Sequence, residues 1–551
     1  MSDARPSRAW VWALLAAFTL VSLYVLGIRT LVPPDEGRYA EMAREMFATG
    51  DWVTTRLNGI KYFEKPPLQT WMNALSFAVF GLGDWQARLW TGLCGILGVV
   101  LTGYTGVKVF GERTGFYAAL VLGSCFFWAA CSQIDSLDMS LSAMMTISLT
   151  ALLLAQHDRA GAAERRNWML VCWAGMALAV LAKGLIGIVL PGGVLVVYTL
   201  VTRDWKLWTR LHLGKGLLLF FAIAAPWFVL VGLRNPEQPH FFFIHEHFER
   251  FLLKEHHREA AWYTFFVLTA IGMLPWLGVL PGALRHGAAR EAGTFRPRLM
   301  LLVWFAFILL FFTKSNSKLP GYILPVFPAL ALLTGSYLEH GSRAARQATA
   351  GITALIGAAL LAATPYVTRL PFRPGEDALL QAAQPWMLAA GFSALVGGGA
   401  AFLWGRQLRR DLAVVALAVG GFAATELLLA GFEPYGNQRA AAPMIPLIQA
   451  ELKPDTKLYS VRIYEQSLTF YLRRTVTLVD YWDEFSFGLK QEPQRSIPTV
   501  PEWIAIWTRD AQAGVKSVAI IAPEALRTLQ AQGVPLRVIA QDARRAVIAN
   551  L

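Results

Sequence analysis

Two segments beyond the first apolar run of the chain hold the residues best suited to chemistry, PPDEGRYAEM from Pro33 and KYFEKPP from Lys61. Polar groups that directly follow a membrane span are placed to meet a lipid headgroup. Singly they have simpler explanations, because Asp35 could cap a helix and the lysines could anchor the chain among headgroups. Their clustering favours a binding site instead. The clustered residues are Asp35, Glu36, Arg38, Tyr62, Glu64 and Lys65.

The elements that must position these residues are two predicted helices with a turn between them. Apolar residues from Tyr39 to Phe47 recur at helical spacing after Asp35, and Gly50 ends the run. This pattern predicts an amphipathic helix lying on the membrane surface. A second helix follows the proline pair of KYFEKPP, because proline suits the first helical turn. The segment KYFEKPP is therefore expected to lie in the turn between two interfacial helices.

The composition predicts an α-helical polytopic membrane protein. Of the 551 residues, 55% are hydrophobic and 20 are tryptophan, which is too apolar for an ordinary soluble protein. The net charge is +13, but the basic residues lie in short loops between apolar runs, so we expect no nucleic-acid binding. The four cysteines lack the paired spacing of a disulfide framework or a metal knuckle.

Apolar runs of about 17 to 25 residues predict about 13 transmembrane helices. The first run lacks a small-residue cleavage site, which predicts a retained anchor rather than a signal peptide. The runs lie near residues 9–28, 89–110, 114–130, 138–156, 168–182, 184–201, 215–233, 262–282, 299–313, 318–338, 350–366, 385–404 and 412–431.

The loops that face the cytoplasm, if the N-terminus does, carry 16 basic and six acidic residues, as positive-inside bias requires. The outer face then receives residues 29–88, 234–261 and everything after 432. From about residue 440 the pattern changes to short β-rich runs, KLYSV, TVTLVD, WIAIW, SVAII and LRVIA, with a helical PEALRTLQAQ. We expect a transmembrane domain over residues 1–435 and a soluble α/β domain over 436–551. The α/β domain has no nucleotide-cradling glycine loop, and its simplest role is a structural cap.

The segment DEGRYAEMAREMFATGDW, followed by KYFEKPP, closely resembles the 4-amino-4-deoxy-L-arabinose lipid A transferases. These belong to the polyprenyl-phosphate-dependent membrane glycosyltransferases of the GT-C type, which are related to protein O-mannosyltransferases. The later FFFIHEHFERFL, the number of spans and the outer C-terminal domain extend the likeness over essentially the whole chain. The segment PPLQTW after Lys65 differs from this family, in which small residues are expected to follow the lysine.

The resemblance implies a bacterial inner-membrane enzyme with its active site on the periplasmic side. Such an enzyme moves an aminoarabinose from undecaprenyl phosphate to lipid A phosphate, needs no nucleotide, and gives resistance to cationic peptides and polymyxin. By the same match Asp35 is the catalytic candidate, while Arg38, Tyr62 and Lys65 are expected at the donor phosphate or sugar. We expect a monomer whose partners are the lipid-linked donor, lipid A and membrane lipids.

A phosphate that leaves the anomeric carbon must be stabilised by cations. Lys65 and Arg250 are the first candidates, followed by Lys183 and Lys314. Lys183, at the outer end of the fifth span, either extends to the headgroups or faces a ligand. Two alternatives also stay open for three further residues. Lys314 and Lys318, in a tight turn beside Tyr322, either anchor the chain or contact phosphate, and Asp138 either lines the same cavity or caps the fourth span.

The second outer loop holds five of the nine histidines. Interfacial histidines that make ordinary hydrogen bonds explain this enrichment without a bound metal. The sequence also shows no complete set of four tetrahedral metal ligands. If a divalent ion such as zinc binds, His245 and Glu64 are the expected ligands.

Two other functions fit a chain of this kind. A lipid flippase or transporter usually carries ionisable residues near the membrane midplane and often has internal repeats, whereas here the charges gather at one face and no repeat is evident. A transferase that glycosylates protein or another glycan from the same type of carrier would share the donor site. The sequence therefore distinguishes it poorly from a lipid A transferase.

Overall fold

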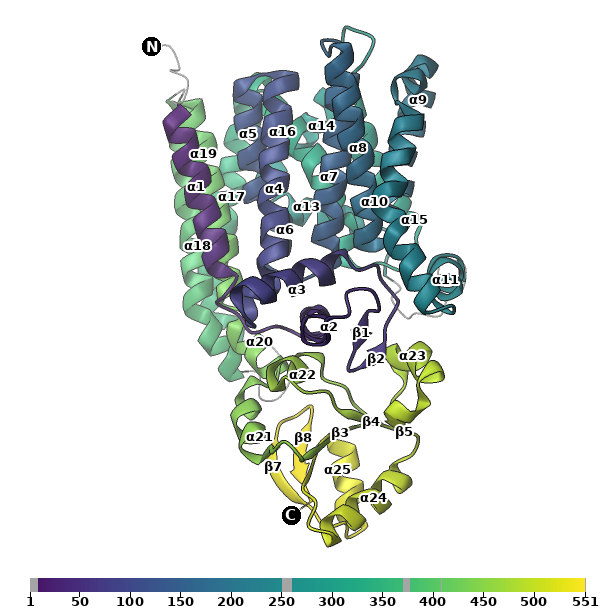
Figure 1. Cartoon of the computed structure of the whole chain (residues 1–551). Coiled ribbons are helices and arrows are strands. Elements are labelled where there is room, and N and C mark those ends of the chain that lie inside the picture. Colours follow the sequence, from purple (N-terminus) through teal and green to yellow (C-terminus); the bar gives the residue numbers. More distant parts are fainter. Residues whose placement is uncertain (1–7, 250–259, 370–376, 408, 551) are drawn as a thin grey trace. The chain divides into compact units, whose positions relative to one another are not determined.

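The computed structural model describes residues 8–249, 260–369, 377–407 and 409–550. Its internal contacts divide the chain into two compact units (Figure 1). The helical unit comprises Met1–Ile28 and Arg88–Pro434, and the mixed unit comprises Arg29–Ala87 and Tyr435–Leu551. The mixed unit therefore joins the first predicted outer loop to the C-terminal domain, although the sequence analysis assigned that loop to the transmembrane domain.

Apolar helices build the helical unit, and most follow the predicted spans. Its first half contains α1 Arg8–Val25, α4 Asp84–Phe110, α5 Glu112–Ser124, α6 Phe126–Cys131, α7 Leu137–Gln156, α8 Ala162–Lys183, α9 Ile186–Thr202, η1 Trp205–Arg210 and α10 Leu213–Arg234. Its second half contains α11 Gln238–His240, the π-helix η2 Phe241–Glu249, α13 Thr264–Gly272, η3 Trp276–Val279, α14 Leu280–Ala288, α15 Pro297–Lys314, η4 Pro320–Val326, α16 Phe327–His340, α17 Arg343–Ala363, η5 Thr364–Arg369, α18 Asp377–Arg406 and α19 Arg410–Ala430.

Among the described residues, eight helices are long and apolar enough to cross a membrane, or nine if one bent pair counts as a single span. The prediction of about 13 is larger because some predicted spans are broken or short. The span near 114–130 is divided between α5 and α6, and the span near 262–282 bends by 112° between α13 and the η3–α14 segment. The 13-residue α5 rises only about 20 Å, less than a bilayer core.

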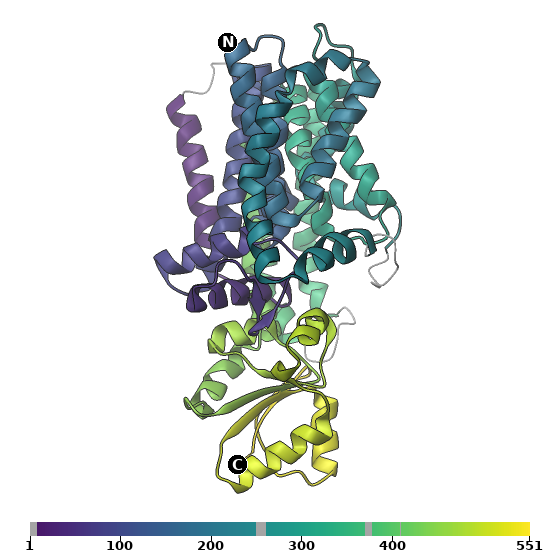
Figure 2. The ribbon, with the colours of Figure 1, turned by 45° about the vertical axis from the view of Figure 1, so that its right-hand side comes forward.

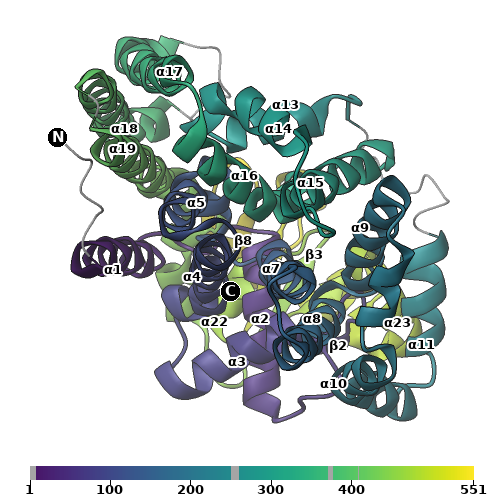
Figure 3. The ribbon, with the colours of Figure 1, turned by 90° about the horizontal axis from the view of Figure 1, so that it is seen from above.

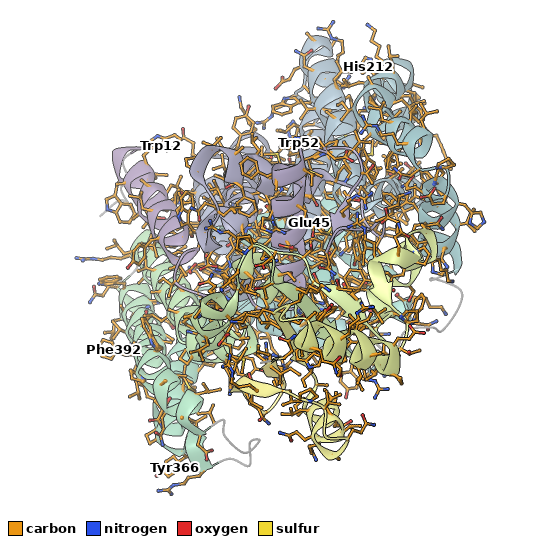
Figure 4. The ribbon with its side chains drawn as sticks, turned by 60° about the horizontal axis from the view of Figure 1, so that its bottom comes forward. Trp12, Glu45, Trp52, His212, Tyr366 and Phe392 are labelled. Atoms are coloured by element: carbon orange, nitrogen blue, oxygen red, sulfur yellow. The ribbon has the colours of Figure 1, made fainter. Side chains whose placement is uncertain are left out.

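Large apolar side chains on the outside of these helices identify the surface that lipid covers. Trp12, Tyr366 and Phe392 are 70%, 57% and 61% exposed, and all three project outward from their helices (Figure 4). Such exposure is costly in water and neutral in hydrocarbon. The helical unit is therefore a multi-pass membrane domain.

Polar contacts place the predicted cytoplasmic loops at one end of the helical unit. The Arg343 guanidinium donates to the carbonyl of Arg406 at 2.7 Å, which joins the start of α17 to the end of α18. The backbone N–H of Thr294 donates to Asp158 at 2.9 Å, which joins the loop before α15 to the loop after α7. His286 on α14 contacts the Ser336 hydroxyl on α16 at 3.1 Å, and this contact connects the helices that lie next to these two pairs of loops.

The C-terminal part of the mixed unit folds around a six-stranded sheet of order β5-β4-β3-β6-β8-β7 (Figure 2). Strands β3, β4, β5 and β6 run parallel to one another, while β8 is antiparallel to both β6 and β7. The strands are β3 Lys457–Val461, β4 Thr477–Val479, β5 Ser496–Ile497, β6 Ser517–Ile521, β7 Arg537–Gln541 and β8 Ala546–Ala549. The helices are α20 Glu433–Arg439, η6 Ala442–Met444, α21 Ile445–Glu451, α22 Gln466–Leu472, η7 Asp483–Phe485, α23 Ser486–Gln491, η8 Pro493–Arg495, α24 Val500–Gln512 and α25 Pro523–Ala531.

Most of the predicted strands are confirmed, but WIAIW is not a strand. It lies inside α24, where Trp503 and Trp507 are four residues apart, share one helix face and pack into the sheet core. The Thr499 hydroxyl accepts from the N–H of Glu502 and caps this helix. A run of five apolar residues fits both the helical and the strand period, so periodicity does not distinguish the two structures. The cap residue Thr499 is the local signal that favours a helix.

The N-terminal part of the mixed unit contains both predicted helices, α2 Asp35–Thr49 and α3 Leu68–Phe80. Gly50 ends α2 with φ of 71°. However, α2 packs against α3 and α22 and buries charged residues such as Glu41 and Arg44. It is therefore not the amphipathic surface helix that the sequence predicted. Between the helices, β1 Arg56–Leu57 and β2 Ile60–Lys61 form a hairpin.

Candidate active site

Arg38 connects the predicted catalytic residue to the C-terminal domain. Its Nη1 donates to Asp35 Oδ1 at 2.7 Å, and its Nε donates to Glu484 Oε2 at 2.7 Å. Gln466 Nε2 in turn donates to Glu484 Oε1 at 2.6 Å. The guanidinium is thus held between two carboxylates. The Asp35 side chain remains 58% exposed, so a ligand can reach it.

The local field keeps Arg38 charged. Burial alone would lower its pKa, but the Tyr62 phenol and the Glu484 carboxylate oppose this effect and raise the pKa well above its ordinary value. Burial also raises the pKa of Glu484, and Arg38 acts against that shift. Tyr62 is buried, and its pKa lies well above the ordinary value mainly because of desolvation. Tyr62 is therefore a neutral phenol at ordinary pH.

A tight hairpin positions Tyr62, Glu64 and Lys65. Its two-residue turn, Asn58-Gly59, has φ values of 55° and 72°, which is the backbone that this dipeptide favours in hairpins. Tyr62 continues the pairing, because its N–H donates to the Thr55 carbonyl at 3.0 Å. The Lys65 ammonium donates to the Glu64 carbonyl at 2.8 Å.

The C-terminal domain holds this hairpin through buried polar contacts. Asn58 Nδ2 donates to the Val476 carbonyl at 2.8 Å, and the Val476 N–H donates to Asn58 Oδ1 at 2.7 Å. Glu492 Oε2 accepts from the Arg56 guanidinium at 3.0 Å and from the Lys61 N–H at 3.2 Å. The C-terminal domain, predicted above as a structural cap, thus supports the candidate catalytic loop.

Buried hydrogen bonds link the side chains of α2 behind Asp35. Arg44 donates to both carboxylate oxygens of Glu41, at 2.6 and 2.7 Å. Burial raises the pKa of Glu41 to about 8, although Arg44 opposes the shift. Glu45, labelled in Figure 4, accepts from the Gly59 N–H at 2.7 Å and so ties α2 to the hairpin turn. Burial also raises the pKa of Glu45.

In the helical unit the structure brings together three predicted residues from three helices. Lys183, the last residue of α8, forms an ion pair with Asp138 in the first turn of α7. The same ammonium lies over the Tyr322 ring, 4.7 Å from its centroid. The N-terminus of α7 has no side-chain cap, so the capping role is not observed for Asp138, which pairs with Lys183 instead. Lys183 points at a partner rather than into the headgroups.

The remaining predicted residues are not gathered into this cluster. Lys314 is exposed at the end of α15, and Lys318 donates to the Ser315 carbonyl at 2.6 Å in the following turn. His245 stacks on the Phe241 ring with centroids 5.2 Å apart. Arg250 lies outside the described residues.

A metal site of three or more His, Cys, Asp or Glu side chains does not occur among the residues that the structure describes. The predicted pair, Glu64 and His245, lies in the mixed unit and the helical unit respectively. These two residues therefore have no third protein ligand in the described part of the chain.

The sequence pattern did not predict the partners of these residues from the C-terminal domain. Glu484 and Glu492 are 446 and 436 residues from the arginines that they bind. No local pattern marks a pairing across that distance. The hairpin itself was accessible, because Asn-Gly between apolar residues is a strong hairpin signal.

Comparisons with known proteins match several parts of the chain. The family model for the aminoarabinose transferase C-terminal domain matches residues 444–550, and that for dolichyl-phosphate-mannose-protein mannosyltransferase matches residues 9–242. An undecaprenyl phosphate-α-4-amino-4-deoxy-L-arabinose arabinosyl transferase from Aeromonas hydrophila is 33% identical over 355 residues. That match covers 63% of this chain and 64% of the relative, less than two thirds of its length.

Solved structures match over nearly the whole chain. The crystal structure of ArnT from Cupriavidus metallidurans in the apo state is 40% identical, covers 98% of each chain and has a TM-score of 0.92. The structure of the same protein bound to undecaprenyl phosphate is also 40% identical, covers 99% of this chain and 98% of the other, and has a TM-score of 0.93. The chain therefore belongs to the ArnT family of aminoarabinose transferases, which are membrane glycosyltransferases.

Proposed function

We propose that this protein transfers 4-amino-4-deoxy-L-arabinose from undecaprenyl phosphate to phosphate groups of lipid A, on the periplasmic face of a bacterial inner membrane. The observation that carries the proposal is the likeness, over nearly the whole chain, to an ArnT structure bound to undecaprenyl phosphate. The added amine offsets negative charge on lipid A, and the expected consequence is resistance to polymyxin and other cationic peptides.

The reaction is a substitution at the anomeric carbon of the sugar. An oxygen of the lipid A phosphate forms the new bond to that carbon, while the bond to the undecaprenyl phosphate oxygen breaks. The leaving oxygen keeps the electron pair, so undecaprenyl phosphate departs as a dianion and the acceptor becomes a phosphodiester. The donor is already activated, and the reaction needs no nucleotide.

Cations are the main requirement, because negative charge grows on the departing phosphate. In the mixed unit Lys65 and Arg38 are the proposed phosphate ligands. Arg38 is held by carboxylates on two sides, which fixes its direction before the donor binds. In the helical unit the cluster of Lys183, Asp138 and Tyr322 supplies a second set of proposed donor ligands.

Asp35 is proposed to act on the sugar or the acceptor rather than as a strong base. The second pKa of a phosphate monoester is about 6, so the acceptor is already mostly ionised at neutral pH. Asp35 Oδ1 accepts from Arg38, and Oδ2 has no hydrogen-bond partner among the described residues. That free oxygen can stabilise positive charge developing on the sugar ring or pair with the 4-ammonium group.

A divalent ion held by Glu64 and His245 stays a hypothesis. Metal analysis of the purified wild type against His245→Ala tests it. One ion per chain that disappears in the variant supports the site, and equal metal content in both proteins rejects it.

Mass spectrometry of lipid A tests the proposed function directly. In a strain able to make the donor, expression of this chain should add a pentosamine mass to lipid A phosphate, and a Lys65→Ala, Asp35→Asn double variant should not. Unchanged lipid A with the wild type would overturn the proposal. The alternatives would then be a transferase for protein or another glycan, detected as a glycosylated product, or a flippase, detected by carrier movement without transfer.

A further inference from the structure

A cavity of about 320 Å³ lies within the helical unit, away from the residues proposed for sugar transfer. It is formed between the ends of α16, α17, α18 and α19 and reaches inward to η3. Figure 3 shows α17, α18 and α19 side by side along one edge of the helical unit, with α16 next to them. Every lining residue belongs to the helical unit.

The cavity has two chemically distinct parts. Three arginines line it, Arg343, Arg346 and Arg410. The other part is apolar and includes Trp276, Leu338 and Val414, all of them buried. A phosphate attached to a hydrocarbon body has this same division into an anionic and an apolar part.

The three guanidinium groups have no described carboxylate partner. Arg343 donates to the carbonyl of Arg406, and Arg346 donates to the carbonyls of Leu338 and Gly341 at 3.3 and 2.7 Å. Arg410 donates to the backbone carbonyl of Glu339.

The nearby acids are engaged elsewhere. The Glu339 carboxylate accepts from the Thr114 hydroxyl at 2.6 Å, and Asp411 accepts from Arg113 at 3.1 Å. The three arginines of the cavity therefore form no ion pair with a carboxylate of the described residues.

The helix ends add to this charge. Arg343 and Arg410 are the first residues of α17 and α19, and a helix N-terminus carries a positive partial charge. Cations at that end are unfavourable for the helices, and a bound anion would relieve the unfavourable field of both helices and arginines.

We propose that this cavity binds the headgroup of an anionic phospholipid from the cytoplasmic leaflet. The lipid phosphate lies among the three arginines, and the glycerol and upper acyl chains lie on the apolar wall. The leaflet follows from the basic loops at this end of the unit, because positive-inside bias places them in the cytoplasm. Basic pockets between transmembrane helices on that side suit anionic headgroups.

Native mass spectrometry of the purified full-length chain tests the site. The protein is equilibrated with either phosphatidylglycerol or phosphatidylcholine of the same acyl composition. The wild type should retain phosphatidylglycerol at least several-fold better. Equal retention of both lipids would overturn the proposal, as would displacement of the bound lipid by millimolar inorganic phosphate, since the site would then take a free anion.

Three variants locate the binding. Arg346→Gln combined with Arg410→Gln removes two charges, while Gly405→Leu fills the cavity without changing charge, since a Cβ there meets only Gln347 Cγ at 3.9 Å. Both variants should lose most of the retained phosphatidylglycerol. Arg406→Gln, an exposed arginine at the end of α18, should retain it. Loss in all three, or in none, would reject the cavity as the site, and Gly405→Leu guards against a folding defect in the double variant.

Discussion

Arginines in two regions of this protein are held in opposite ways. In the mixed unit Arg38 lies between the carboxylates of Asp35 and Glu484, so its charge is balanced and its direction is fixed. In the helical unit Arg343, Arg346 and Arg410 donate only to backbone carbonyls among the described residues, and none of them pairs with a described carboxylate. The first arrangement suits precise positioning in catalysis, and the second suits binding an anion from the surroundings.

This difference follows from what each region is made of. The mixed unit brings together segments that are more than 400 residues apart, and an acid from one segment can meet an arginine from the other. The arginines of the helical unit lie at helix ends, where carbonyls without intrahelical partners are the nearest acceptors. Carbonyl acceptors orient a guanidinium without cancelling its charge.

The largest expected effect is that of Asp35→Asn, which removes one charge next to Arg38. Turnover should fall roughly 100-fold while donor binding persists, because a group that acts in the transition state affects kcat more than KM. Steady-state kinetics with purified protein and donor, alongside a binding assay, measures both quantities. Near-normal turnover in a folded variant would remove Asp35 from the mechanism. Asp455→Asn, an exposed acid, is the matched control.

The next effect is on stability. Asn58→Ala removes both hydrogen bonds to Val476 and leaves two buried backbone groups unpaired, which should cost about 2 kcal/mol of unfolding free energy. A thermal unfolding curve detects this as a lower midpoint for the mixed unit. Gln530→Ala, at an exposed position of the same unit, should leave the midpoint unchanged. Equal midpoints for wild type and Asn58→Ala would mean that the hairpin is not held by this contact.

Glu484→Gln sharpens the comparison, because it keeps the shape of the Arg38 contact but removes its charge. We expect kcat/KM to fall about tenfold, close to the loss of one charge-assisted hydrogen bond of about 1.5 kcal/mol. A double-mutant cycle should show that Arg38→Gln with Glu484→Gln is no worse than Arg38→Gln alone. Additive losses would mean that Glu484 acts independently of Arg38. Asp480→Asn, which breaks the exposed pair with Arg462, is expected to be neutral.

The effect that is smallest within any one pH unit is a slope of stability with pH. The pKa of Glu41 is raised from 4.5 to about 8 in the folded protein, so its proton is bound more tightly in the folded than in the unfolded state. This stabilisation is complete below pH 4.5 and is lost as the pH rises towards 8, by about 1.4 kcal/mol per unit. Glu465, whose pKa burial raises to about 7, contributes in the same direction. The thermal unfolding midpoint should therefore fall as the pH is raised from 5 to 8, and it should fall less in the Glu41→Gln variant. An equal slope in both proteins would contradict the assignment.

The sequence determined the class of the molecule and the identity of its chemical residues. Apolar runs longer than about 17 residues have few alternatives to membrane helices, because backbone groups in lipid must be satisfied within the segment. The first segment was predicted as two helices around a turn, and α2 and α3 confirm that prediction. Local periodicity and caps carried this information, as Gly50 and the prolines before α3 show.

Only the tertiary structure decided which residues meet. The pairing of Lys183 with Asp138 and Tyr322 depends on how three helices pack, and either role of Asp138 was consistent with its sequence position. The contact of Glu484 with Arg38 links segments at opposite ends of the chain.

A sequence pattern reports the face and the period of an element, because these are set by neighbours within a few residues. It does not report the partner, because partners are chosen by the burial and charge balance of the whole fold. For this reason the catalytic candidates could be read along the chain, whereas the acids that hold them and the arginines of the lipid cavity appeared only when the helices and the sheet were assembled.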